Sequence, residues 1–155
     1  MLFRSKTKSR VREWESFCTS ILTGDAQTVQ DLMNSFMEES ISIRDTFVGR
    51  AYKENFYHGL LLGLLTADGR WLVRSNAESG TGYPDISLWA PSKRTGCIIE
   101  VKYAENGTFD TALDEAMRQI EEQDYVSSLR LDGAETIRKY GIAFYKKTCR
   151  VRYRE

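Results

Sequence analysis

The sequence predicts an α/β fold in which a central mixed sheet, with an antiparallel hairpin at its core, is flanked by helices. Apolar residues repeat at helical steps up to residue 66, alternate as in strands over residues 71–103, return to a helical pattern and end in strands. This order is typical of helices packed on one sheet. A chain of 155 residues with 41% apolar side chains can bury one core. We therefore expect a single domain over residues 1–155, in which a helical region, 1–44, packs on the core, 45–155.

The first part of the chain is expected to form two amphipathic helices. Apolar steps of three and four predict one over residues 11–22, ended by Thr23 and Gly24. Asp25 is a suitable N-cap, because its carboxylate can accept a hydrogen bond from a free backbone amide, and it predicts a second helix to residue 39. The predicted buried stripes are Trp14, Phe17, Cys18, Ile21 and Leu22 in the first helix, and Val29, Leu32, Met33, Phe36 and Met37 in the second.

A third helix is predicted over residues 45–66. After Gly59 this segment is apolar on nearly every side, which is typical of a helix buried against a sheet. Its inward residues are expected to be Phe47, Val48, Ala51, Tyr52, Phe56, Leu60 and Leu64.

Three consecutive strands are predicted next, over residues 71–76, 85–89 and 96–103. A glycine-rich turn at 79–82 and a turn containing proline at 91–94 separate them. Because short turns join antiparallel neighbours, we expect a meander.

The last part of the chain is expected to form one helix and two strands. The helix is predicted over residues 111–126, and the strands over 139–145 and 150–153. In the last strand Val151 and Tyr153 alternate with arginines across the pleat. The predicted buried stripe of the helix is Ala112, Leu113, Ala116, Met117 and Ile120.

The net charge of zero hides a segregation of charge along the chain. Residues 1–12 hold five bases and no acid, residues 138–155 hold seven bases and one acid, and the remainder holds ten bases and twenty-one acids. Basic ends around an acidic middle fit a polyanion bound beside a cation site. Solvated termini explain the same pattern. The arginines of residues 150–154 fit an edge strand protected by charge, and a contact with the DNA backbone is the second interpretation.

Several other classes of protein are excluded by the sequence. The longest apolar run, residues 60–67, is much shorter than the roughly 18 to 20 residues of a membrane helix, and no signal peptide opens the chain, so we expect a cytoplasmic protein. Cys18, Cys97 and Cys149 are odd in number and form no CxxC pair, which predicts core thiols rather than disulfides or a zinc site. No phosphate-binding loop of the Gly-x-x-x-x-Gly-Lys-Ser/Thr type occurs.

Two acids and a lysine are expected to meet in the core hairpin. Because side chains alternate along a strand, Glu100 and Lys102 share one face of a strand whose other face is apolar. If the turn at 91–94 joins this strand to the preceding one, Asp85 reaches the end of the same ladder. A cross-strand ion pair is the structural alternative.

This group of residues matches the chemistry of a hydrolytic metal site. The carboxylates of Asp85 and Glu100, joined by the backbone carbonyl of Val101, are the oxygen ligands that magnesium prefers. A bound Mg²⁺ ion can activate water for phosphodiester hydrolysis, and Lys102 can orient that water or offset developing charge.

The spacing and residue types resemble the PD-(D/E)XK nuclease superfamily. Pro84-Asp85 and Glu100-Val101-Lys102 stand at its two signature positions. About two thirds of the chain, residues 22–125, looks like a bacterial branch whose nuclease-like domain often follows an AAA-ATPase-like domain. The resemblance implies a restriction-endonuclease-like fold and a nuclease that depends on Mg²⁺ or Mn²⁺ and acts on nucleic acid, DNA above all. It also allows an ATPase partner and a homodimer.

The same resemblance implies further site residues. Glu54, on the helix before the sheet, would be another acid at the metal site, and Gln119 and Tyr125 would lie near the substrate. On helical geometry alone Glu54 fits a solvated residue and Gln119 a structural amide. His58, one turn after Glu54, is expected to be a packed histidine bonded to a neighbour rather than a proton carrier. Where that branch commonly has arginine two residues before the aspartate, this chain has Tyr83.

Two other functions stay open at the level of sequence. A catalytically inactive fold of this type would bind nucleic acid or another protein and keep the acids as a structural network. A component of a defence system or mobile element would cut only together with a separate ATPase.

Overall fold

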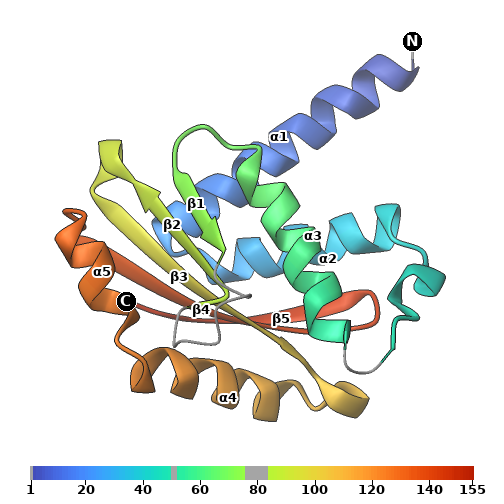
Figure 1. Cartoon of the computed structure of the whole chain (residues 1–155). Coiled ribbons are helices and arrows are strands. Elements are labelled where there is room, and N and C mark those ends of the chain that lie inside the picture. Colours follow the sequence, from blue (N-terminus) through green and yellow to red (C-terminus); the bar gives the residue numbers. More distant parts are fainter. Residues whose placement is uncertain (1, 50–51, 76–83) are drawn as a thin grey trace.

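The fold is a five-stranded mixed sheet between two layers of helices (Figure 1), which confirms the predicted α/β class. The computed structural model describes residues 2–49, 52–75 and 84–155, with side chains from residue 7 onward. The strands are β1 (Leu72–Ser75), β2 (Ile86–Ala90), β3 (Thr95–Tyr103), β4 (Thr136–Tyr145) and β5 (Thr148–Arg154), and they lie in this order across the sheet.

Strand directions follow the connections between the strands. β1, β2 and β3 form the predicted antiparallel meander. β3 and β4 run parallel because two helices connect them, and β4 returns through a tight turn to antiparallel β5. The described strands begin and end within a few residues of the predicted ones, with the largest difference at β4, which begins at Thr136.

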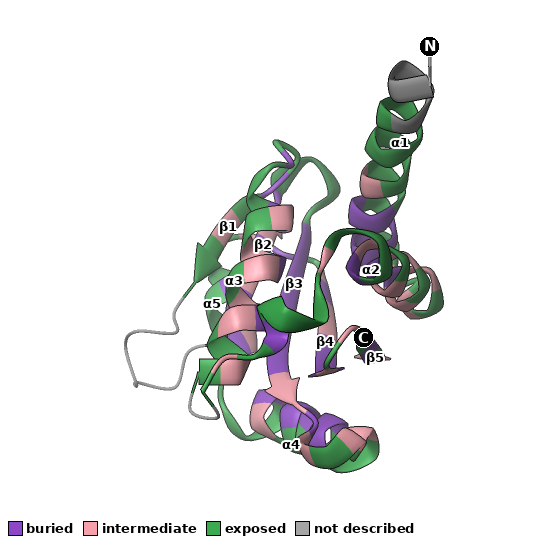
Figure 2. Cartoon of the chain, turned by 90° about the vertical axis from the view of Figure 1, so that its right-hand side faces the viewer, coloured by how far each residue is buried: buried purple, intermediate pink, exposed green. Residues whose placement is uncertain are grey.

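The two faces of the sheet carry separate apolar clusters. On one face, α1 (Leu2–Thr23), α2 (Ala26–Ser40) and α3 (Lys53–Thr66) pack against a set that includes Cys97, Ile99 and Val101 of β3. On the other face, α4 (Phe109–Glu122) and α5 (Tyr125–Leu131) pack against Ile98 and Ile137. Figure 2 shows that β3 is buried along most of its length between these layers.

The first two helices form where they are predicted, and α1 is longer than expected. The Asp25 carboxylate accepts a hydrogen bond from the amide of Thr28 at 3.1 Å, which confirms the predicted cap. Gly24, with φ of +85°, makes the turn before it. α1 begins at Leu2 because residues 2–10 contain neither Gly nor Pro, and it projects from the body of the protein in Figure 1.

The prediction of a helix starting at residue 45 is wrong. The side chain of Ser42 and that of Asp45 form a capping box around a short 3-10 turn, η1 (Ile43–Thr46), and the α-helix starts only at Lys53. The side chain of Phe47 is 79% exposed and that of Tyr52 65% exposed, so neither points inward as expected.

The buried face of α3 is also displaced by one residue from the predicted one. Tyr57, Leu61 and Leu65 are buried. Phe56, Leu60 and Leu64 are only partly buried and pack at the margin of the same cluster. The predicted inward residues Val48 and Ala51 lie before the helix, and Ala51 lies outside the described residues.

The predicted helix over residues 111–126 is divided into α4 and α5. The backbone of Gln123 is extended, and the Asp124 carboxylate caps a new helix by accepting a hydrogen bond from the amide of Ser127. Tyr125 therefore stands at the start of α5 instead of the end of α4. The predicted stripe of α4 is buried throughout.

The arginines of β5 face acidic residues of α4. Arg152 pairs with Asp110 and Asp114, and Arg154 pairs with Glu121. The segregation of charge along the chain is therefore partly cancelled in space, because bases from the C-terminal end meet acids from the middle. These pairs hold α4 to the edge of the sheet.

Two further expectations concern the thiols and the membrane. Cys18, Cys97 and Cys149 are buried and free, as predicted. Among the helices that the structure describes, none is long and apolar enough to cross a bilayer.

Candidate active site at the end of the β2–β3 hairpin

The β2–β3 hairpin places Asp85 opposite Glu100. The turn between the strands is η3 (Pro91–Lys93) followed by Arg94, whose φ of 49° reverses the chain. In the resulting register Ile86 pairs with Ile99. When this antiparallel register is continued by one position, Asp85, just before β2, lies across from Glu100 of β3. The two side chains are then on the same face of the sheet.

Hydrogen bonds link these two acids through the backbone. The amide of Asp85 donates to Oε1 of Glu100 at 3.3 Å, and Oδ2 of Asp85 accepts from the amide of Val101 at 2.8 Å. The amide and carbonyl of one strand residue point to the same side, so the Val101 carbonyl also faces this edge. Two carboxylates and one carbonyl oxygen therefore gather where β2 begins beside β3.

Glu100 is an unusual residue for its position. Its side chain is fully buried, and its second oxygen, Oε2, has no hydrogen-bond partner among the described residues. Burial first, and the nearby charge of Asp85 second, raise the pKa of Glu100 from 4.5 to about 8, while Lys102 opposes the rise. A buried carboxylate with a free oxygen is stable as an anion only beside a cation.

The donor set therefore fits a divalent metal ion. Within the part of the chain that the structure describes, no group of three or more His, Cys, Asp and Glu side chains could hold a metal ion. The fit rests instead on two carboxylates, one of them with an unpartnered oxygen, and on a backbone carbonyl. Oxygen ligands of this kind, completed by water, suit Mg²⁺ and Mn²⁺.

Lys102 lies on the same face and is held by α4. Its ammonium group donates a hydrogen bond to Oε1 of Gln119 at 2.8 Å. α4 comes close to the sheet at this point because Gly141, the β4 neighbour of Glu100, has no side chain. A Cβ atom on Gly141 would lie 3.1 Å from the Cβ atom of Ala116.

Tyr125 completes this side of the site. Burial raises the pKa of Tyr125, the nearby Gln119 side chain opposes the rise, and the charges of Glu100 and Asp85 add to it. The phenol therefore lies close to the amide and to both acids. The helix break at Gln123 turns the start of α5 toward the sheet and makes this placement possible.

Glu54 reaches the same strand from the helix on the other face. It stands in the first turn of α3, and its Oε1 accepts a hydrogen bond from the amide of Tyr103 at 3.2 Å. The amides of Val101 and Tyr103 point to the same edge of β3, about 7 Å apart. Glu54 thus contacts the backbone of β3 next to Lys102 and is exposed, whereas Asp85 bonds the same strand two residues earlier, at Val101.

His58 contacts the site through the backbone. Its Nε2 atom lies 3.1 Å from the carbonyl oxygen of Asp85 and 3.1 Å from the hydroxyl of Ser75. It is therefore a histidine bonded to its neighbours, as expected. No pattern in the sequence singles out Ser75, which ends β1 opposite Ile86, next to Asp85.

Tyr83, the predicted turn at 79–82 and the rest of segment 76–83 lie outside the described residues.

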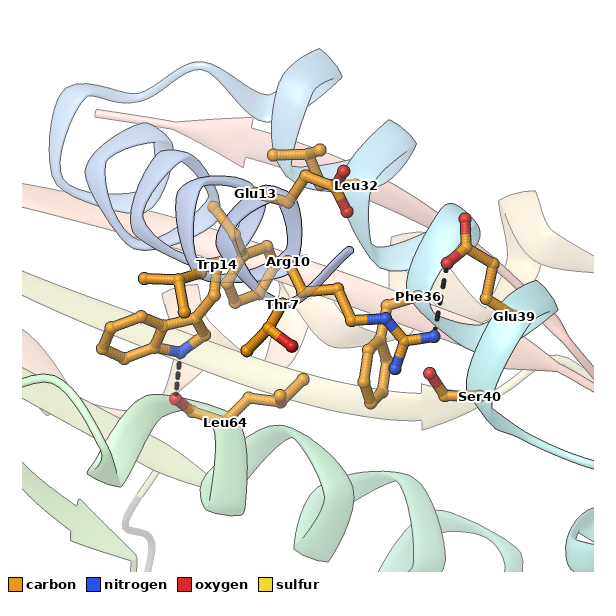
Figure 3. Close-up of a pocket in the computed structure, with 11 residues that line it drawn as sticks. Thr7, Arg10, Glu13, Trp14, Leu32, Phe36, Glu39, Ser40 and Leu64 are labelled. Carbon is orange, nitrogen blue, oxygen red and sulfur yellow. Dashed lines mark hydrogen bonds and ion pairs between the residues drawn. The ribbon is translucent and has the colours of Figure 1, made fainter. Parts of the chain in front are cut away.

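A separate apolar cleft lies between α1, α2 and α3 (Figure 3). It has a volume of about 330 Å³ and is lined by Trp14, Phe17 and Phe36, with Arg10 and Glu39 paired at its rim. Trp14 donates a hydrogen bond to the carbonyl of Leu64 at 2.9 Å. None of the acids at the hairpin lines this cleft, so its chemistry is unrelated to theirs.

Comparison with known proteins gives one match. The family model described as the PD-(D/E)XK nuclease superfamily matches residues 52–154, a range that includes every predicted site residue. No curated protein and no solved structure matches the chain.

Proposed function

This chain belongs to the PD-(D/E)XK nuclease superfamily, and we propose that it hydrolyses phosphodiester bonds, with DNA as the substrate and Mg²⁺ or Mn²⁺ as the cofactor. The observation that carries the proposal is the buried Glu100, whose Oε2 lacks a partner beside Asp85. A structural acid at this depth is expected to have all its acceptors satisfied. An oxygen left for a metal ion explains the exception.

Each residue of the site then has a chemical role. Asp85, Glu100 and the Val101 carbonyl would hold the metal ion, and Glu54 would complete the acidic pocket. When bound there, the ion would acidify a water molecule and neutralise charge on the phosphate. Lys102 holds the attacking water in line and offsets developing negative charge.

Two residues of the helical layer would support the substrate side. Gln119 fixes the position of the Lys102 amine by accepting its hydrogen bond. Tyr125, whose hydroxyl is close to Gln119 and Glu100, would donate a hydrogen bond to a phosphate oxygen.

The direct test is DNA cleavage by the purified chain. Single-stranded and double-stranded DNA incubated with Mn²⁺ should be cut, and both EDTA and Lys102→Ala should abolish cutting. Lys93→Ala is a matched control, because Lys93 is an exposed lysine in the hairpin turn. Cleavage that survives Lys102→Ala would remove the role proposed for this residue.

A catalytically inactive binding module is the second candidate. It is favoured by the fact that the polar groups of Lys102 and Asp85 are both engaged inside the protein, with Gln119 and the amide of Val101. Calorimetric titration with Mn²⁺ separates the two candidates. Absence of binding at millimolar Mn²⁺ by a folded protein would favour the inactive module, whereas binding lost in Glu100→Gln would favour the nuclease. An ATPase partner and a homodimer stay predictions.

A further inference from the structure

A second cavity opens beside the candidate site, at the end of β3. It has a volume of about 410 Å³. It lies where the segment after α2, the start of α3 and the turn between β4 and β5 come together, at one end of the molecule in Figure 1. Its lining residues are Ile43, Thr46, Phe47, Val48, Gly49, Lys53, Tyr57, Tyr103 and Lys146.

We propose that this cavity binds one unstacked nucleotide of a single-stranded substrate, next to the phosphate that is cut. The position beside the cut phosphate rests on the proposed nuclease function. The cavity would hold a part of the substrate that the acids do not contact. It is carried by three features of the cavity: aromatic walls, cationic walls and a position one residue from the site.

The aromatic walls combine stacked inner rings with one exposed ring, Phe47, that can meet a nucleobase. The rings of Tyr57 and Tyr103 are nearly parallel, 6.3 Å apart with an angle of 13° between their planes. Tyr57 also stacks on Phe144, so its ring is fixed. The side chain of Phe47 stands at the wall with 79% of its surface exposed, which leaves one aromatic face free of internal packing. Bases of single strands stack on exposed aromatic side chains such as Phe47.

The cationic walls suit the phosphate of the same nucleotide. The lining residues include two lysines and no acid among those that the structure describes. The amine of Lys53 lies 3.0 Å from the hydroxyl of Tyr103 and 4.4 Å from the centre of its ring. Lys146 enters from the turn between β4 and β5. Aromatic faces interleaved with ammonium groups are typical of surfaces that bind single-stranded nucleic acid.

The cavity is joined to the candidate site through two pairs of neighbouring residues. Lys53 of the cavity precedes Glu54, and Tyr103 of the cavity follows Lys102. The amide of Tyr103 also donates a hydrogen bond to Glu54. A strand that passes along the end of β3 can therefore place one phosphate at the acids and the next nucleotide in the cavity.

A base must be unpaired and unstacked to enter the cavity, and this requirement favours one class of substrate. A base inside a duplex is paired and stacked, and it enters a protein cavity only after it is extruded at a cost of a few kcal/mol. A base in a single strand, a gap or a frayed end bears no pairing cost. The cavity therefore favours single-stranded or locally unpaired DNA over a continuous duplex.

The test measures binding without turnover, in EDTA, with a fluorescent oligothymidylate as the probe. Phe47→Ala should weaken binding by about fivefold to a hundredfold, the range of one lost stacking contact. Leu131→Ala is the control, because Leu131 is 89% exposed on α5 and does not line the cavity. Since Phe47 is exposed, its replacement should leave thermal unfolding unchanged.

An oligothymidylate with one abasic position identifies the contact as stacking. The abasic probe should bind the unchanged protein more weakly than the intact probe when the gap falls on the bound nucleotide, and this difference should vanish in Phe47→Ala. Lys53→Gln and Lys146→Gln should each lower the slope of log affinity against log salt by about 0.7, whereas Lys93→Gln should not. Equal binding by Phe47→Ala and the unchanged protein would overturn the proposal, and so would the absence of any binding.

These experiments distinguish failure of the nucleotide-binding proposal from failure of the proposed nuclease function. If Lys102→Ala abolishes cleavage while Phe47→Ala binds and cuts normally, the nuclease stands and the nucleotide cavity fails. If no cleavage occurs under any metal while Phe47→Ala loses binding, the cavity stands and the nuclease fails.

Discussion

The ammonium group of Lys102 and the side-chain oxygen of Gln119 form a hydrogen bond of 2.8 Å that joins β3 to α4 beside the buried Glu100. A lysine side chain has four rotatable bonds, so an amine without a partner would sample many positions. The bond restricts it to the face of the sheet that carries the acids. The position of α4 is therefore coupled to the position of the proposed catalytic amine.

Removal of the Gln119 acceptor should slow cleavage without abolishing it. In Gln119→Ala the amine of Lys102 remains but is no longer held, so we expect a loss of about tenfold in rate, against about 10² to 10⁴ for Lys102→Ala. Rates at saturating Mn²⁺ measure the difference. Gln119→Glu is the matched control, because its carboxylate can still accept the bond. Full activity in Gln119→Ala would show that the contact is only structural.

The metal-free protein should lose stability as the pH rises from about 4.5 to about 8. The pKa of Glu100 is raised from 4.5 to about 8 by burial and by Asp85. In this window the folded state keeps a proton that the unfolded state releases, so the free energy of unfolding falls as pH increases. The stabilisation is complete below the lower value and lost above the upper one. A total change on the order of a few kcal/mol is expected.

Urea unfolding in EDTA at a series of pH values measures this change. Glu100→Gln, which cannot ionise, should flatten the dependence on pH within this window. Mn²⁺ should restore stability to the unchanged protein at pH 8 but not to Glu100→Gln, because binding to the folded state adds stability. The same slope in both proteins would assign the dependence to another group.

The hairpin that carries the acids was predictable because its signals are local. Alternation of apolar and polar residues sets which side chains share a face, and the turn after Pro91 sets the register. Once the register is known, Asp85 and Glu100 must stand opposite one another. Their chemical roles stay predictions, because metal binding depends on positions that no pattern of residues records.

The parts that were not predicted depend on competing caps and on tertiary contacts. Ser42 and Asp45 close a turn that ends the helical pattern before residue 47, and Asp124 starts a new helix where the apolar stripe of α4 continues. Because the helix does not include residue 47, Phe47 lies on the surface, where it lines the proposed nucleotide cavity. The ion pair between Arg152 and Asp110 of α4 joins residues far apart in the chain. The pattern of charges along the sequence cannot reveal such a contact.

His58 should control metal affinity through the backbone of Asp85. Its Nε2 atom contacts the Asp85 carbonyl at 3.1 Å, so loss of the ring should loosen the strand end that carries the carboxylate. His58→Leu is expected to weaken Mn²⁺ binding by about tenfold, the lower end of the range for residues that support metal ligands. Calorimetric titration measures it. His58→Gln, which keeps a donor, is the control, and unchanged affinity in His58→Leu would contradict the role.

The arginines of β5 should contribute to stability rather than to DNA affinity. Arg152 is 31% exposed in its side chain and pairs with Asp110 and Asp114, so its charge is already balanced by α4. Arg152→Ala should lower the free energy of unfolding by up to about 1 kcal/mol, as expected for a partly exposed pair. It should leave the dependence of oligothymidylate binding on salt unchanged, because no phosphate contact is lost. Lys53→Gln provides the contrast, since it should change the salt dependence. A smaller salt slope in Arg152→Ala would instead place nucleic acid against the β5 edge of the sheet.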